Sequence, residues 1–303
     1  MMQEFGGRWH SVLTGPEDNC TPASTPPVIA LHCSGADGRQ WRKLADVVAP
    51  RFNLIAIDCY GCESTGAWPG ERPFTLADEA RRVVDLIDRL GTAVHLVGHS
   101  YGGGVALRVA VERPAAIASL TLYEPSAFHL LSQLGPGGLA AREEILRLDH
   151  AVSSGVVSGD YHAAITSFVD YWNGAGAAAA LQPKVREALL RWLPKAPLDF
   201  RALLGERTPL AAYRQLGVPA LILRGQNGPE PSRLIAESLA RVIRRARLSV
   251  VPGAGHMGPF THADEVNTSI AEHLRSASAA AAIRSLRALV DHVLPPFPGS
   301  IAA

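Results

Sequence analysis

Residues 93–110 read AVHLVGHSYGGGVALRVA, an order of side chains that predicts a strand, a sharp turn and a helix. The apolar run before Gly98 is typical of a buried strand, and the run after Gly102 has the composition of a helix. Ser100 stands at the apex of the turn. So sharp a turn forces strained backbone angles on the serine and leaves little room beside it, which explains the flanking glycines. We therefore expect the Ser100 hydroxyl to stand out above the edge of a sheet.

This G-x-S-x-G turn between a strand and a helix resembles the nucleophile elbow of the α/β-hydrolase family, and the resemblance covers residues 25–275. In that family the order along the chain is nucleophile, acid, histidine, with the histidine in a loop after the last strand. His256 obeys this order, because it follows the strand-like run 247–251 in a glycine-rich loop. The resemblance implies that Ser100 is the nucleophile and His256 the general base.

A second segment supports the resemblance. Residues 27–35 read PVIALHCSG, a buried-strand pattern that ends in a polar loop similar to the family's His-Gly-x loop. That loop supplies one backbone N–H of the oxyanion hole, and the residue after the nucleophile supplies the other. By this resemblance the two donors are the main-chain amides of Ser34 and Tyr101. Cys33 stands where the family normally has glycine, which leaves the path of this loop open.

The acid of the triad has two candidates. In most relatives an aspartate follows the strand after the inserted cap, and Gly228 stands at the matching position here. Some branches of the family place a carboxylate after the strand that follows the elbow helix, and the corresponding strand-like run 119–123 ends at Glu124. The resemblance therefore favours Glu124, with Glu230 as the alternative. A third possibility is that Glu124 only accepts hydrogen bonds at a strand end.

Strand and helix patterns alternate along much of the chain. Residues 54–57 form a continuous apolar run, as in a parallel strand that is buried on both faces. Thr75 has the character of a helix N-cap, apolar residues follow at helical spacing, and Gly91 ends them. Repeated strand–helix units predict an α/β fold, a doubly wound and mostly parallel sheet with the site at the carboxyl ends of its strands.

Between residues 127 and 215 only helical patterns occur, and this interval falls where the family inserts a helical cap. Residues 1–126 and 216–275 are then expected to form the hydrolase core. Six aromatic residues of the interval either line a pocket or pack the cap's own core, namely Phe128, Phe168, Tyr171, Trp172, Trp192 and Phe200.

The last part of the chain, residues 276–303, lies beyond the usual end of the family. Its apolar residues recur at helical spacing, which predicts one amphipathic helix. Such a helix must bury its apolar face, either on the body of the protein or on a second subunit, and we favour the body. The expected state is a monomer or a homodimer.

Composition restricts the partners and cofactors. The 303 residues carry 29 Lys and Arg against 28 Asp and Glu, and no basic stripe predicts nucleic-acid binding. No signal peptide is visible, and no apolar run reaches the roughly 18 residues of a membrane helix, so we expect a cytoplasmic protein that does not bind membranes. Cys59 and Cys62 have C-x-x-C spacing without a second pair, which favours incidental thiols over a zinc or redox site. We expect neither metal nor cofactor.

These observations favour a serine hydrolase that cleaves carboxylic esters of small or medium, largely uncharged molecules through an acyl-enzyme. Hydrolysis of a carbon–carbon bond, a lactone or an amide by the same triad is an alternative, and so is a non-catalytic ligand-binding member of the fold. Dehalogenase and epoxide hydrolase chemistry are disfavoured, because those relatives carry aspartate where this chain has Ser100. Sequence leaves open the substrate and the cap residues that contact it.

Overall fold

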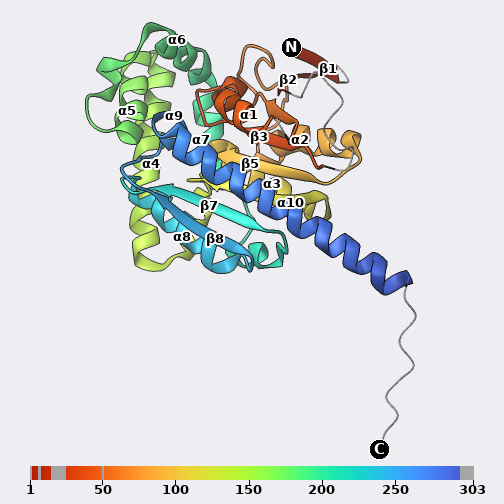
Figure 1. Cartoon of the computed structure of the whole chain (residues 1–303). Helices are drawn as coiled ribbons and strands as arrows, with labels where there is room; N and C mark the ends of the chain where they lie inside the picture. The colour runs from red at the N-terminus through yellow and green to blue at the C-terminus, as the bar shows by residue number, and fades with distance from the viewer. Residues whose placement is uncertain (1, 6–7, 15–24, 50, 294–303) are drawn as a thin grey trace, which may run out of the picture.

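A computed structural model describes residues 2–5, 8–14, 25–49 and 51–293. One sheet of eight strands forms its centre, in the order β1-β2-β4-β3-β5-β6-β7-β8 (Figure 1). The strands are β1 (Met2–Phe5), β2 (Arg8–Thr14), β3 (Val28–Leu31), β4 (Leu54–Ile57), β5 (Val94–His99), β6 (Ile117–Tyr123), β7 (Ala220–Gly225) and β8 (Ala246–Val251).

The sheet is mostly parallel, as predicted. Strands β3 to β8 pair only in parallel with one another, whereas β1 and β2 add an antiparallel edge beside β4. Parallel neighbours need a crossover, which the chain makes with helices. The carboxyl ends of β3, β5, β6 and β7 consequently meet at one edge of the sheet, where the loops that carry the predicted site residues begin.

Helices cover both faces of the sheet. The α-helices outside residues 127–215 are α1 (Arg42–Val48), α2 (Leu76–Leu90), α3 (Tyr101–Glu112), α8 (Glu230–Val242), α9 (Gly258–Thr261) and α10 (Ala263–Val293), with 3-10 turns η1 (Gly38–Trp41) and η2 (Pro114–Ala116). Helices α1 and α10 pack on one face, and α2, α3 and α8 pack on the other. Successive strand residues point to opposite faces, so Ile29 enters one core and Ala30 the other.

The expected boundaries of α2 are confirmed. Thr75 and Asp78 form a capping box at its start, in which each side chain bonds the other residue's backbone N–H. Gly91 ends the helix with φ 61°, a left-handed conformation that glycine adopts without strain.

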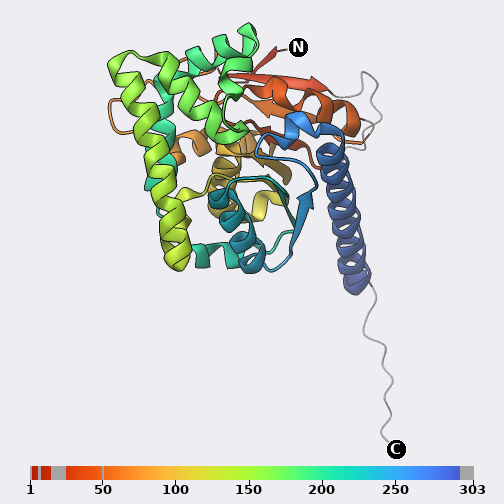
Figure 2. The ribbon, with the colours of Figure 1, turned by 90° about the vertical axis from the view of Figure 1, so that its left-hand side faces the viewer.

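Residues 127–215 connect β6 to β7, and every regular element within them is a helix. Their bounds are η3 (Phe128–Gln133), α4 (Gly135–Ser158), α5 (Tyr161–Asn173), η4 (Ala177–Ala180), α6 (Pro183–Trp192), η5 (Leu193–Lys195), α7 (Ala196–Gly205) and η6 (Leu210–Gln215). Figure 2 shows the long helix α4 on one side of the molecule and α10 on the other, with the sheet between them. The helical content agrees with the predicted cap, whose independence as a domain stays a prediction.

The C-terminal segment differs from the expectation of a separate helix, because α10 continues without a break to Val293. The run of alanines from residue 279 has high helix propensity and gives the helix no reason to end. Packing on the body extends at least to Ser278, whose hydroxyl lies 3.0 Å from Nε2 of His95. Further along, Ile283 is exposed, and Figure 1 shows the end of α10 projecting from the body. The structure describes the backbone of α10 beyond Ile283 but not the side chains that would form the predicted apolar face, and residues 294–303 lie outside the described part.

None of the helices in the described ranges combines the length and the apolar character that crossing a membrane requires.

Candidate active site

Ser100 occupies the strained turn that the sequence predicts between β5 and α3. Its φ is 54° and its ψ is −117°, an unfavourable combination for a residue with a Cβ. Gly98 and Gly102 flank the serine, and neither position has room for a side chain. A Cβ on Gly98 would lie 2.8 Å from Cα of Gly103, and one on Gly102 would lie 2.5 Å from the carbonyl carbon of Leu31. Any larger residue at either position would push the turn away from the sheet.

The structure brings Ser100, His256 and Glu124 into one hydrogen-bonded row. Nε2 of His256 lies 2.9 Å from Oγ of Ser100, and its Nδ1 lies 2.7 Å from Oε2 of Glu124. All three side chains are buried. A carboxylate only accepts, so Nδ1 carries the proton and Nε2 is left free to accept from the serine hydroxyl. This protonation state is the one that a general base needs.

Glu124 is held in place by its backbone and by a neighbouring strand end. Its φ is 39°, and among the described residues only Ser100 and Glu124 combine a side chain with a positive φ. The amide of Gly225 donates to Oε1 at 2.8 Å, while Oε2 faces His256. Backbone strain at two residues of one site indicates that the surrounding structure fixes both side chains.

The alternative acid, Glu230, lies elsewhere. It opens helix α8, its side chain is 51% exposed, and it pairs with Arg233 at 2.6 Å. Arg233 lowers the pKa of Glu230 through this hydrogen-bonded pair. No contact of Glu230 with His256 occurs among the described residues, so the geometry brings Glu124 and not Glu230 to the histidine.

The predicted oxyanion donors are the amides of Ser34 and Tyr101, and within the described ranges neither amide donates to a protein acceptor. Tyr101 is the first residue of α3, where backbone N–H groups have no partner inside the helix. The neighbouring amide of Cys33 is engaged, because it donates to Oε1 of Gln40 at 3.0 Å. Cys33 is buried and lines the main cavity, where burial raises the pKa of its thiol to about 12.

A chain of hydrogen bonds connects the loop of Cys33 to the loop of His256. Since Oε1 of Gln40 accepts from Cys33, its Nε2 is the donor to Nδ1 of His99 at 3.1 Å. Nε2 of His99 then carries the proton and donates to the backbone oxygen of His256 at 2.9 Å. Burial, together with the adjacent His256, holds the pKa of His99 well below its usual range. The neutral His99 thus links two loops of the site.

Two further side chains touch the triad, and sequence reasoning assigned a role there to neither. Oγ of Ser126 lies 3.1 Å from Oγ of Ser100. The indole of Trp172, on α5, stacks on the ring of His256 with centroids 4.0 Å apart and planes inclined by 27°. Ser126 follows Glu124 by two residues, which is a weak signal, whereas no pattern links Trp172 to a histidine 84 positions away.

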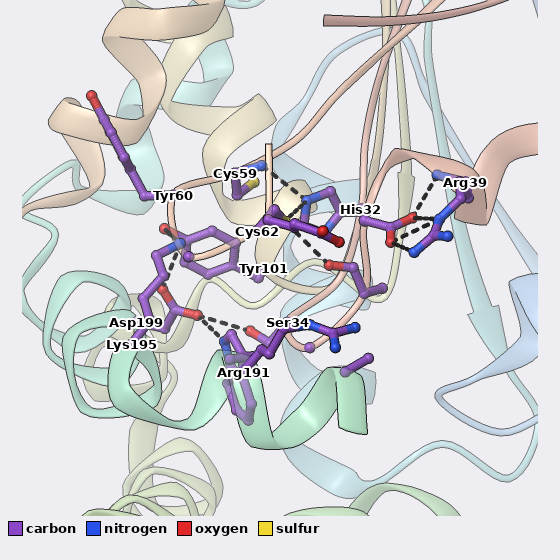
Figure 3. A pocket seen from close by; sticks show the side chains of 17 residues that line it. His32, Ser34, Arg39, Cys59, Tyr60, Cys62, Tyr101, Arg191, Lys195 and Asp199 are labelled. Atoms are coloured by element: carbon purple, nitrogen blue, oxygen red, sulfur yellow. Dashed lines mark hydrogen bonds and ion pairs between the residues drawn. The ribbon is translucent and has the colours of Figure 1, made fainter. Parts of the chain in front are cut away.

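A buried network of ion pairs and hydrogen bonds joins the helical segment to Ser34 and to Tyr101 at the start of α3, and Figure 3 shows Lys195 and Asp199 of this network beside both residues. Nζ of Lys195 lies 2.7 Å from Oε2 of Glu79 and 3.1 Å from Oδ1 of Asp199. The hydroxyl of Tyr101 donates to Glu79 at 2.9 Å, and that of Ser34 donates to Asp199 at 3.3 Å. Burial raises the pKa of Asp199. The side chains of Ser34 and Tyr101, whose amides are the candidate oxyanion donors, therefore bond to two carboxylates that share Lys195 as an ion-pair partner.

A cavity of about 820 Å³ opens above the row and is lined by both Ser100 and His256. A smaller inner chamber adjoins Ser100 and Ser126, and five of the six aromatic residues singled out in the sequence line it: Phe128, Phe168, Trp172, Trp192 and Phe200. Tyr171 instead donates its hydroxyl to Glu144 at 2.6 Å. The volume is that of an ordinary small-molecule site.

Cys59 and Cys62 lie beside this region without forming a pair. Both are free thiols, and Sγ of Cys62 lies 3.5 Å from Nε2 of His32. His32, Asp58 and Cys62 could in principle hold a metal ion, since their ligand atoms lie within 4.8 Å of one another. Two of the donors are already used, because Nε2 of His32 accepts from the Cys59 amide and Asp58 accepts from the Gly38 amide. These bonds fit a loop anchor better than a metal site.

Comparison with known proteins agrees with this geometry. The model of the alpha/beta hydrolase family matches residues 28–268. The pimeloyl-[acyl-carrier protein] methyl ester esterase of Nitrosomonas europaea is 24% identical over 79% of this chain and 92% of its own. An enol-lactonase from Burkholderia xenovorans superimposes with a TM-score of 0.67 at 17% identity, over 84% of this chain and 94% of that one.

A thermophilic esterase from Thermogutta terrifontis is similar in fold, with a TM-score of 0.62, 24% identity and coverage of 84% and 90% of the two chains. The strand order, the elbow and the family match over residues 28–268 all agree. The chain belongs to the alpha/beta hydrolase family.

Proposed function

We propose that the protein is a serine hydrolase that cleaves carboxylic esters through an acyl-enzyme. The observation that carries the proposal is the row from Glu124 through His256 to Ser100, with distances of 2.7 and 2.9 Å. Ser100 is a poor nucleophile while its hydroxyl is protonated, and His256 is placed to take that proton as the oxygen attacks a carbonyl. Glu124 orients the imidazole and stabilises the imidazolium that forms.

The tetrahedral oxyanion would be stabilised by the amides of Ser34 and Tyr101. Loss of one such donor typically costs roughly a hundred- to a thousand-fold in rate. His256 would return its proton to the leaving alcohol, which departs and leaves Ser100 acylated. Water activated by the same histidine would then hydrolyse the acyl-enzyme.

Ester hydrolysis is supported by two relatives whose names describe esterases, one similar in sequence and one in fold. Lactone hydrolysis uses the same steps, and a lactonase shares the fold. The helices over the site contribute five aromatic side chains next to Ser100, together with Asp199 and Leu203, and this mostly apolar wall would limit the access of water to the acyl-enzyme.

The proposal is tested by hydrolysis of p-nitrophenyl butyrate, with Ser100→Ala purified identically as the control. We expect turnover by the wild type and a loss of at least about a thousand-fold in the variant. Equal rates for the two proteins would show that Ser100 is not the nucleophile. If both are inactive on this ester, a panel of lactones and amides separates another hydrolase from a ligand-binding protein.

A further inference from the structure

The mouth of the main cavity is strongly cationic, although the whole chain has a net charge of only +1. Five basic side chains line the cavity, and all are exposed: Arg39, Arg42, Lys43, Lys184 and Arg191. Asp37 is the one carboxylate among the residues that line the cavity. The exposed basic side chains therefore make this cavity positively charged, although the net charge of the whole chain is close to zero.

Two of the five cations have partners. Arg39 donates to Asp37 at 3.0 Å, and Arg191 pairs with Glu187 one helical turn away at 2.8 Å. Figure 3 shows Arg39 and Arg191 close to the Ser34 loop. For Arg42, Lys43 and Lys184 the described residues supply no ion pair. Three positive charges at the mouth are thus left for a bound molecule.

The position of Lys184 is unfavourable for the fold itself. It is the second residue of α6, a ten-residue helix whose first turn contains no acidic side chain. The first turn of a helix carries partial positive charge, so acids stabilise it and cations do not. Helix α2 follows the usual arrangement, with Asp78 and Glu79 in its first turn. Lys184 therefore adds positive potential at the mouth without a gain in local stability.

The interior of the site has the opposite character. The chamber next to Ser100 is lined mainly by aromatic rings, with Asp199 and Leu203 among them, and Ser100, Phe168 and Trp172 line both this chamber and the main cavity. A ligand in the main cavity would place an apolar group against Phe168 and Trp172 near Ser100 and a negative charge at the mouth, several atoms away. A cleft lined by charge of one sign concentrates ligands of the other sign.

We propose that the substrates are esters that carry a carboxylate or phosphate group remote from the scissile bond, held by Lys43, Lys184 and Arg42. The inference deepens the proposed ester hydrolysis and rests on it for the reaction, but the binding of the anion can be tested alone. It replaces the expectation from composition that the substrates are largely uncharged.

Two pairs of esters test the proposal, each pair differing only by one charge. Mono-4-nitrophenyl suberate and its methyl ester carry the difference on the acyl side. 4-Acetoxybenzoate and its methyl ester carry it on the alcohol side. We expect kcat/KM to be at least about tenfold higher for the anion in one pair, and the preference to shrink as NaCl rises from about 20 to about 500 mM.

Charge reversal identifies the residues. Lys43→Glu with Lys184→Glu should lower kcat/KM for the preferred anion by roughly tenfold or more while leaving its neutral partner within about twofold. Arg244→Glu is the matched control, because Arg244 is exposed in the loop that precedes β8, at the end of the sheet opposite the site. A loss of both esters alike, or an equal effect of Arg244→Glu, would contradict the assignment.

Binding separates this inference from the proposed reaction. Calorimetry with octanoate, octyl phosphate and neutral octanamide on the wild type requires no turnover. Tighter binding of either anion than of octanamide, lost in the double variant, supports the site and shows which anion it prefers, even if no ester is hydrolysed. Equal binding of all three probes, or equal kcat/KM within both ester pairs, would overturn the inference while the ester hydrolysis stands.

Discussion

Gly228 leaves the space that the carboxylate of Glu124 occupies. A Cβ at position 228 would overlap Oε1 of Glu124 and lie 2.8 Å from its Cδ. The φ of Gly228 is outside the left-handed region, so the backbone would accept another residue and only the carboxylate excludes it. Position 228 follows β7, and Glu124 follows the adjacent parallel strand β6. An aspartate at position 228 and a glutamate at position 124 would compete for the same space, so the glycine at 228 accompanies the glutamate at 124.

Glu124→Gln is expected to lower kcat by about a thousand-fold or more without unfolding the protein. An amide at this position can present an N–H to Nδ1 of His256 and so favour the wrong tautomer. Steady-state rates on p-nitrophenyl butyrate and a thermal unfolding curve give both quantities. Glu230→Gln is the matched control, since its side chain is exposed and paired with Arg233, and it should stay within about twofold of the wild type. A large loss in the control with little effect at position 124 would reverse the assignment.

Gly228→Ala should displace the Glu124 carboxylate and reduce kcat by roughly tenfold or more, because a misplaced catalytic group loses rate steeply. The informative variant combines Gly228→Asp with Glu124→Gly. It vacates the space and supplies a carboxylate from the neighbouring strand end, so kcat should recover at least about tenfold relative to Glu124→Gly alone. Additive losses in the double variant would mean that the two positions do not share one site.

Parts of the fold could be predicted because their signals are local. The elbow, the N-cap of α2 and the carboxylate that follows β6 each depend on a few consecutive residues. The stack of Trp172 on His256 and the ion pair of Lys195 with Glu79 join residues far apart in the chain. Such contacts depend on how the helices between β6 and β7 pack against the core, and the spacing of apolar residues along one segment does not predict this packing.

Gln40→Glu tests the hydrogen-bond chain from Cys33 to His256. A glutamate accepts from Cys33 with one oxygen and turns its second oxygen, another acceptor, toward Nδ1 of His99. His99 must then move its proton to Nδ1 and lose the bond to the His256 carbonyl, or become charged while buried. We expect kcat to fall about tenfold or more and the ¹⁵N shifts of His99 to report the new state.

The same substitution elsewhere serves as the control. Gln133 accepts from the amide of Leu210 at 3.0 Å, and a glutamate there keeps that acceptor. Gln133→Glu should therefore leave kcat and the His99 spectrum unchanged. If Gln40→Glu also leaves both unchanged, the chain of bonds does not position His256.

Lys195→Met should destabilise the protein by about 3–5 kcal/mol, the usual cost of removing one partner from a buried ion pair. It leaves Asp199 and Glu79 as buried carboxylates with Arg82, 3.6 Å from Glu79, as the remaining cation. Urea unfolding measures the loss. Adding Asp199→Asn should recover part of it, and Arg201→Met, an exposed change on α7, should have little effect. A stable single variant with no response to the second change would contradict the role of the lysine.

Acid should weaken the fold through His95, which is fully buried between the hydroxyls of Ser119 and Ser278. Burial, with His273 nearby, lowers the pKa of His95 to about 4 from 6.5. The unfolded chain therefore binds the proton first, and stability is lost as the pH falls from 6.5 toward 4. At pH 5 this contribution is about 2 kcal/mol.

The measurement is the free energy of unfolding in urea at about pH 7.5 and about pH 5. His95→Gln should be less stable than the wild type at the higher pH, because a packed side chain is changed. Its further loss on acidification should be smaller than that of the wild type by about 2 kcal/mol. His150→Gln, an exposed change on α4, should keep the full wild-type loss. If His95→Gln and the wild type lose the same free energy, another buried histidine is responsible, and His273, whose pKa burial also lowers to about 4, is the next to replace.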